Sequence, residues 1–265
     1  MEFQTLIVEQ DANGVARVRL NRPEVHNAFD ATMIVELRDV ALKLAGDDDV
    51  RVVVLSGEGK SFSSGADLHW MKEAAAFTPE ENRMDASRLS NMLHALDTMP
   101  KPLITLIHGS AFGGGVGLAA VADIAIAVRD TRFALSEVRL GLTPSTIAPY
   151  VIAAIGAGNA RSYFLSGAPF DGLEAQRIGL VHQIAENAEE LETLAEEWIN
   201  DILSAAPGAV ANAKKLVATI SGRELTPRLM EETSEMIAAQ RASVEGREGM
   251  AAFLEKRKPA WFKKT

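Results

Sequence analysis

The segment from residue 101 to residue 137 constrains the fold of this chain most strongly. It contains the apolar, β-branched run Leu103–Ile107, three consecutive glycines at 113–115 and a stretch of small residues at 116–122. The apolar run predicts a buried strand, and the small residues predict a helix. A strand, a glycine turn and a helix N-terminus together favour negative charge, because unpaired N–H groups and the helix dipole both point toward the turn. The segment ends at the carboxylate of Glu137. Amides that stabilise an anion and a nearby acid together indicate chemistry on a carbonyl group.

The patterns before this segment predict an α/β protein. Residues 3–9 and 15–20 are strand candidates separated by the turn sequence Asp-Ala-Asn-Gly. A helix is expected to begin after Asp30, a typical N-cap residue, and to end at Gly46. The segment 51–55, which is apolar after Arg51, predicts the next strand. Alternating strands and helices are typical of α/β folds.

The rest of the chain predicts further helices, and its last part is helical throughout. A helix is expected to begin near Leu68, and a last strand is expected at 180–184. Helical stretches are also expected around residues 152 and 163, with a helical turn from residue 171. Further helices are expected at residues 79–96, 191–202, 207–220, 225–244 and 247–256. The β-rich part is therefore expected to end near residue 185.

Composition and charge argue against several classes of function. The 265 residues carry a formal net charge of −9, with a pI of about 5.2, whereas general nucleic-acid binding needs a basic surface. There is no cysteine, and the five histidines are scattered without the spacing of metal ligands. No Gly-x-Ser-x-Gly motif is present. We therefore expect no metal, no nucleic-acid partner and no serine or cysteine nucleophile.

The longest stretch without Asp, Glu, Lys or Arg, residues 102–122, has the length of a membrane span. Pro102, His108 and the glycines within it favour a buried strand, turn and helix instead. The N-terminal residues lack the basic start and apolar core of a signal peptide. We expect a cytoplasmic protein with no membrane partner.

A second glycine-containing loop, residues 56–67, also follows a strand candidate and precedes a helix. Two such turns predict two backbone N–H donors that converge on one oxygen, as in an oxyanion hole. The amides of Ala66 and Gly114 are the candidates. The alternative is that the glycines only permit tight turns. A dinucleotide site is not favoured, because the run 113–118 lacks the third glycine of the Rossmann fingerprint.

Several motifs, in order along the chain, resemble the enoyl-CoA hydratase/isomerase (crotonase) family. They are Asn-Arg-Pro-Glu at 21–24 with His-Asn-Ala at 26–28, Ser-Phe-Ser-Ser-Gly-Ala-Asp-Leu at 61–68, His-Gly at 108–109 with the three glycines, Glu-Val at 137–138 with Leu-Gly at 140–141, and Glu-Lys-Arg-Lys at 255–258. The resemblance covers essentially the whole chain. It implies an α/β fold built as a spiral of ββα repeats. It further implies a core with an acyl-CoA site at residues 1–200 and a helical oligomerisation region at 201–265, which would form a homotrimer or a dimer of trimers.

The resemblance also implies an acyl-CoA thioester substrate and residues that bind it. The thioester oxygen would accept hydrogen bonds from the amides of Ala66 and Gly114, and Glu137 would be the catalytic carboxylate. The residues that would line the substrate and coenzyme A site are Ala28, Ser64, Asp67, Leu68, His69, Gly113, Phe253 and Lys256. In some members of the family, the C-terminal positions come from a neighbouring subunit. Coenzyme A would enter as part of the substrate, with no other cofactor.

The chain departs from the family pattern at one catalytic position, and this departure narrows the expected activity. Typical hydratases of the family carry a first catalytic glutamate three residues after the middle glycine, where this chain has Gly117. The finer pattern at 112–118 and 134–150 resembles bacterial hydratases of 3-substituted glutaconyl-CoA, which act on 3-methylglutaconyl-CoA in leucine breakdown or on 3-isohexenylglutaconyl-CoA in acyclic terpene breakdown. The candidates to meet the distal carboxylate of such a substrate are His69, Lys72, Arg83 and Tyr150. A further hypothesis is that Gly117 makes room for the 3-substituent.

These features predict a hydro-lyase with one acid–base residue. Glu137 is expected to have a raised pKa in apolar surroundings, to orient water and to pass a proton to the α-carbon. An alternative is an enoyl-CoA isomerase, which needs only one acid–base group. A second alternative is a non-catalytic relative that binds acyl-CoA or RNA. The presence of Glu137 and of both glycine loops argues against lost activity, and the acidic pI argues against RNA.

Overall fold

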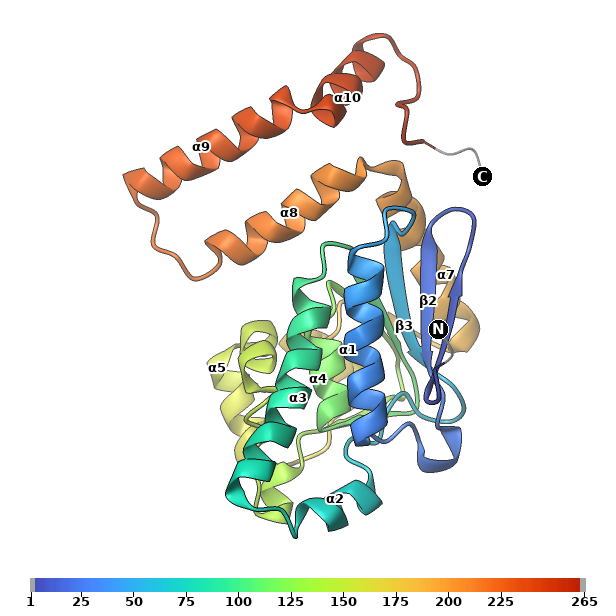
Figure 1. The fold of residues 1–265 in the computed structure, drawn as a ribbon, viewed down its shortest axis with the longest axis vertical. Coiled ribbons are helices and arrows are strands. Elements are labelled where there is room, and N and C mark those ends of the chain that lie inside the picture. The colour runs from blue at the N-terminus through green and yellow to red at the C-terminus, as the bar shows by residue number, and fades with distance from the viewer. Residues whose placement is uncertain (1–2, 263–265) are drawn as a thin grey trace.

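The computed structural model describes residues 3–262, whose arrangement is shown in Figure 1. Within these residues, six strands form the main sheet in the order β1-β2-β3-β4-β6-β8. They are β1 (Leu6–Gln10), β2 (Val15–Leu20), β3 (Val52–Gly57), β4 (Leu103–Ile107), β6 (Ile124–Val128) and β8 (Gln183–Ala185). β1 and β2 pair antiparallel as the predicted hairpin, and the other pairs of this sheet are parallel. β8 begins later than expected, because the N–H groups of Leu180 and Val181 still donate to Ala175 O at the end of the preceding helix.

A second, shorter ladder accompanies the main sheet. β5 (Ser110–Phe112) and β7 (Arg132–Ala134) pair in parallel. Single bridges join Phe29 to Ala66, Ser63 to Ala111 and Phe133 to Phe170. Successive turns of the chain therefore place a longer strand in the main sheet and a short extended segment in the second ladder before a helix follows. This is the spiral of ββα repeats that the family resemblance implies.

Helices pack on both faces of the main sheet. The helices up to residue 204 are α1 (Ala31–Ala45), α2 (Leu68–Ala74), α3 (Pro79–Thr98), α4 (Gly114–Ala120), α5 (Ala148–Ser166), α6 (Gly172–Ile178) and α7 (Ala188–Ser204). Side chains alternate along a strand, so Val53 and Leu55 of β3 join the core with α1 and α3, whereas Val52 and Val54 pack with α7. Burial on both faces explains why the inner strands read as continuous apolar runs. As predicted, Asp30 caps α1, accepting a hydrogen bond from the Met33 amide at 2.8 Å.

The last helices extend away from the core (Figure 1). They are α8 (Pro207–Ile220), α9 (Pro227–Ala242) and α10 (Val244–Leu254). Val217, Ile237 and Phe253 are among their exposed apolar side chains, and apolar surface of this kind is typical of an interaction region. The boundary near residue 200 between the core and the expected oligomerisation region stays a prediction. Residues 263–265 of that region lie outside the described part. Within residues 3–262, no helix is long and apolar enough to cross a membrane.

Candidate active site

The parallel pair β5 and β7 brings the glycine turn and Glu137 together. Phe112 and Ala134 are partners in the ladder, so both strands end at the same edge. The Gly113 amide donates to Ala134 O at 2.9 Å, and Gly113 has a φ of +48°, which favours glycine. A Cβ added to Gly113 would lie 3.2 Å from Glu137 Oε1. The carboxylate of Glu137 therefore faces the turn that leads into α4.

The Ala66 amide is free within a loop whose neighbouring amides are bonded. The N–H groups of Ser64 and Asp67 donate to backbone oxygens at 2.9 Å, and that of Gly65 lies 3.3 Å from Ser63 Oγ. Among residues 3–262, the Ala66 N–H has no acceptor. Phe29 N–H donates to Gly65 O at 2.7 Å, and because the peptide group is planar, the Ala66 N–H points the opposite way.

The Gly114 amide lies close to this loop. Gly114 is the first residue of α4, where an N–H has no partner inside the helix, and no side chain caps this end. A Cβ added to Gly65 would lie 2.9 Å from Phe112 O, and one added to Gly114 would lie 2.5 Å from the Phe29 ring. The two predicted donors thus belong to adjacent turns in contact through Phe29. This arrangement is consistent with an oxyanion hole.

Glu137 has the surroundings of a proton-transfer group. Burial raises the pKa of its carboxyl group above the usual value, although its own backbone N–H acts in the opposite direction. Glu137 Oε2 is enclosed, and within residues 3–262 it has no hydrogen-bond partner. No ion pair of the described residues includes Glu137, so a structural role in a salt bridge is not supported. A carboxyl group with a raised pKa can both accept and deliver a proton near neutral pH.

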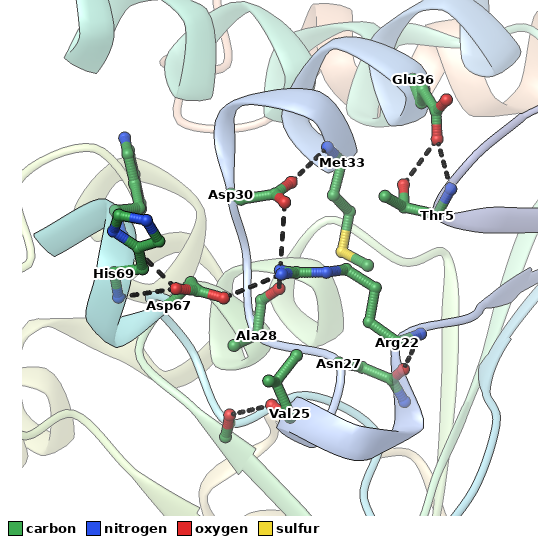
Figure 2. A network of polar contacts seen from close by, with 12 residues as sticks. Thr5, Arg22, Val25, Asn27, Ala28, Asp30, Met33, Glu36, Asp67 and His69 are labelled. Carbon is green, nitrogen blue, oxygen red and sulfur yellow. Dashed lines mark hydrogen bonds and ion pairs between the residues drawn. The ribbon is translucent and has the colours of Figure 1, made fainter. Parts of the chain in front are cut away.

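A cavity of about 920 Å³ lies beside the Ala66 loop. Of the residues predicted to bind the substrate, Ala28, Ser64, Ala66, Asp67, Leu68 and His69 line it. Figure 2 shows Ala28, Asp67 and His69 grouped near Arg22, a residue to which the sequence assigned no role. The structure therefore brings this set together, and the contacts of each residue with coenzyme A stay predictions.

The two C-terminal site residues lie elsewhere in this chain. Phe253 is near the end of α10, and Lys256 follows that helix. Figure 1 places α10 at the opposite end of the molecule from α2, whose first residues line the cavity. Phe253 and Lys256 are thus remote from the cavity of their own chain.

The candidates for a distal carboxylate are also dispersed. His69 lines the cavity beside Ala66, and Lys72 is exposed on α2. Arg83 is exposed on α3 and pairs with Glu80 at 2.6 Å. Tyr150 lines a different cavity, of about 920 Å³, between α8 and the ends of α3, α4 and α5.

The hypothesis that Gly117 makes room for a substituent is wrong. Gly117 is buried, and a Cβ added to it would lie 2.5 Å from Ile147 Cγ2 and 3.5 Å from Leu93 Cδ2. Ile147 therefore fills the space next to Gly117. No local pattern in the sequence shows that positions 117 and 147 meet, so a role for Ile147 could not be predicted.

Replacement of Gly117 by glutamate is expected to lower the free energy of unfolding by about 1–3 kcal/mol or more, because the new side chain must displace Ile147. It is not expected to increase hydratase activity. Urea unfolding and steady-state rates measure the two effects. Gly158→Glu is the control, since a Cβ at Gly158 in α5 meets nothing within 4 Å. Equal stability of the two variants would show that position 117 has room after all.

Comparisons with known proteins show the family to which the chain belongs. A sequence profile described as "Enoyl-CoA hydratase/isomerase" matches residues 10–264. A short-chain-enoyl-CoA hydratase from Clostridium acetobutylicum is 34% identical over 265 residues, which cover 99% of each chain. The crystal structure of an enoyl-CoA hydratase from Shewanella pealeana is 40% identical, covers 98% of this chain and 97% of its own, and has a TM-score of 0.95. AtuE from Pseudomonas aeruginosa is 38% identical, with coverage of 98% and 100% and a TM-score of 0.93. The chain therefore belongs to the enoyl-CoA hydratase/isomerase family, with the crotonase fold and the enzymatic character that its motifs predict.

Proposed function

We propose that this protein is a hydratase that adds water across the α,β double bond of a 3-substituted glutaconyl-CoA. The observation that carries the proposal is the partly buried carboxyl group of Glu137, which has a raised pKa and faces the glycine turn at Gly113. Position 117 carries no carboxylate, and Ile147 fills the space beside it, which supports Glu137 as the single acid–base group. The similarity of residues 112–118 and 134–150 to hydratases of this substrate class supports the choice of substrate, either 3-methylglutaconyl-CoA or 3-isohexenylglutaconyl-CoA.

In the proposed reaction, the amides of Ala66 and Gly114 bind the thioester oxygen and make the β-carbon electrophilic. Glu137 accepts a proton from water as the water oxygen bonds to that carbon. The double-bond electrons move toward the thioester, and the resulting enolate is stabilised by the two amides. Glu137 then returns the proton to the α-carbon. No cofactor besides the coenzyme A of the substrate takes part.

An isomerase is the second candidate, because one acid–base group suffices to move a proton between two carbons. The experiment that separates the two reactions is incubation with 3-methylglutaconyl-CoA, 3-isohexenylglutaconyl-CoA or crotonyl-CoA in ¹⁸O-labelled water. We expect a glutaconyl thioester to gain one labelled water, measured by mass spectrometry. Conversion of an unsaturated thioester without oxygen uptake would assign the protein to the isomerases.

The positions of Phe253 and Lys256 support an oligomer in which one subunit completes the coenzyme A site of another. We propose a homotrimer or a dimer of trimers in the cytoplasm. The substitutions Lys256→Ala and Glu137→Gln are each expected to lower activity when made in all subunits. Co-refolding the two variants is expected to restore part of the activity, because some sites then combine an intact Glu137 with an intact Lys256. If mixing restores no activity, Lys256 does not act across subunits.

A further inference from the structure

Arg22 lies in the connector between β2 and α1, with only 18% of its side chain exposed. Figure 2 shows its guanidinium group between three acceptors. Nη1 donates to Ala28 O at 2.7 Å and lies 3.3 Å from Asp30 Oδ2, and Nη2 donates to Asp67 Oδ2 at 2.9 Å. Arg22 therefore connects Ala28 and Asp30, which precede α1, with Asp67, the residue that follows Ala66.

Two peptide groups connect this guanidinium to the Ala66 amide. The carbonyl of Ala28 and the N–H of Phe29 belong to one planar peptide group, and the carbonyl of Gly65 and the N–H of Ala66 belong to another. The two groups are joined by the 2.7 Å hydrogen bond from Phe29 N–H to Gly65 O. The chain of hydrogen bonds begins at Arg22 and ends at the Ala66 N–H, the predicted oxyanion donor.

The positive charge of Arg22 at the start of this chain of hydrogen bonds polarises every later bond in the same sense. It draws electron density toward Ala28 O, which makes Phe29 N–H a stronger donor to Gly65 O, and the Ala66 N–H is strengthened in turn. Hydrogen bonds in such a chain polarise one another, most of all where water is excluded.

Asp67 keeps the guanidinium in place. Burial disfavours the charged form of Asp67, but the His69 amide and the Arg22 guanidinium outweigh this effect and hold its pKa below the usual value. Asp67 Oδ1 accepts from the His69 amide at 2.7 Å, at the start of α2, while Oδ2 bonds to Arg22. The carboxylate is thus fixed on both sides.

We propose that Arg22 is a positioning residue of the oxyanion hole, which orients and polarises the Ala66 amide through the peptide groups 28–29 and 65–66. This inference rests on the proposed function, because it requires the Ala66 amide to bind the thioester oxygen. It goes beyond that function by assigning a role in transition-state stabilisation to a residue that does not touch the substrate oxygen.

The test uses the full-length protein in a Glu137→Gln background, so that the bound thioester is not turned over. The ligand is 3-methylglutaconyl-CoA carrying ¹³C at the thioester carbonyl, and the measurement is the isotope-edited infrared frequency of that carbonyl. In the parent, binding is expected to lower the frequency, because the two amides polarise the carbonyl. Adding Arg22→Met is expected to reverse part of this shift with the ligand still bound. An unchanged shift in Arg22→Met would overturn the inference.

Arg22→Lys keeps the test valid if Arg22→Met does not fold. Lysine keeps a positive charge near Asp67 but lacks the planar fork that reaches two acceptors, so it is also expected to reduce the shift. Arg38→Gln on the outer part of α1, where Arg38 pairs with Asp39, is the control for loss of one arginine and should leave the shift unchanged. A full shift in Arg22→Lys would contradict the proposal. A parent that binds the ligand with no shift, or does not bind it, would overturn the proposed function itself and this inference with it.

Steady-state kinetics with an intact Glu137 supply an independent readout. Arg22→Lys is expected to lower kcat about tenfold, a fraction of the roughly 10²–10³-fold loss caused by removing a complete oxyanion donor. KM should change less than about threefold, because the lost interaction is stronger in the transition state than in the ground state. A rise in KM with an unchanged kcat would show that Arg22 only supports binding.

Discussion

Replacing Glu137 by glutamine is expected to lower kcat by about 10²–10⁴-fold, the usual contribution of general acid–base catalysis. Glutamine has nearly the same shape but can neither accept the proton of water nor deliver one to the α-carbon. Acyl-CoA binding should persist, because the amides of Ala66 and Gly114 and the cavity beside the Ala66 loop are unchanged. Stopped-flow rates and calorimetric titration with a substrate thioester measure the two effects. Near-normal turnover would rule out Glu137 as the acid–base residue.

The same substitution is expected to stabilise the fold near neutral pH. Burial raises the pKa of Glu137 in the folded protein, so between the unfolded and the folded pKa the folded state holds more protons, and stability falls as pH rises through this range. Glutamine carries no such penalty. The Tm of Glu137→Gln should therefore exceed that of the unsubstituted protein most clearly above the raised pKa. The difference should shrink as pH falls below the ordinary glutamate pKa, about 4.3.

A pH series of thermal unfolding curves tests this prediction. Glu197→Gln is the matched control, because Glu197 is exposed on α7 and its replacement removes the same charge. If both variants give the same pH profile, burial of Glu137 does not destabilise the folded state. A second consequence concerns activity: protonation of Glu137 removes the base, so kcat should fall on the acid side at a pH above the ordinary range of glutamate.

Replacing Gly114 by alanine is expected to disturb both oxyanion donors at once and to lower kcat by about 10²–10³-fold. The added Cβ would lie 2.5 Å from the Phe29 ring, so Phe29 must move. The backbone of Phe29 holds the loop around Ala66, because its N–H donates to Gly65 O and its carbonyl accepts from the Asp67 N–H. A shift of Phe29 therefore displaces the Ala66 amide as well as the Gly114 amide.

The stability of Gly114→Ala should also fall, by about 1–3 kcal/mol, as expected for an overpacked core. Gly158→Ala is the control, because the same change there meets open space within α5. Rates corrected for the folded fraction, together with urea unfolding curves, separate the catalytic effect from the structural one. A Gly114→Ala variant with normal kcat would show that this amide is not a donor to the substrate.

Much of the fold follows from local patterns in the sequence. The strands predicted at 15–20 and 103–107 are observed at those residues, and α1 begins directly after its predicted N-cap, Asp30. Alternation of side chains, turn residues and N-caps act over a few neighbouring positions, so they can be read without knowing the partner elements. The spiral arrangement came from the family resemblance.

The sequence by itself also predicted the groups with which the chemistry is proposed to proceed: the amides of two glycine turns and the carboxylate of Glu137. The tertiary structure alone decided what surrounds them. Only packing shows that Ile147 fills the space beside Gly117, or that Arg22 reaches the Ala66 amide through hydrogen bonds between two separate loops. The physical reason is the range of the interactions: glycine turns, helix ends and caps depend on a few adjacent residues. Side-chain volume and hydrogen-bond chains instead depend on positions that meet only once the whole chain has packed.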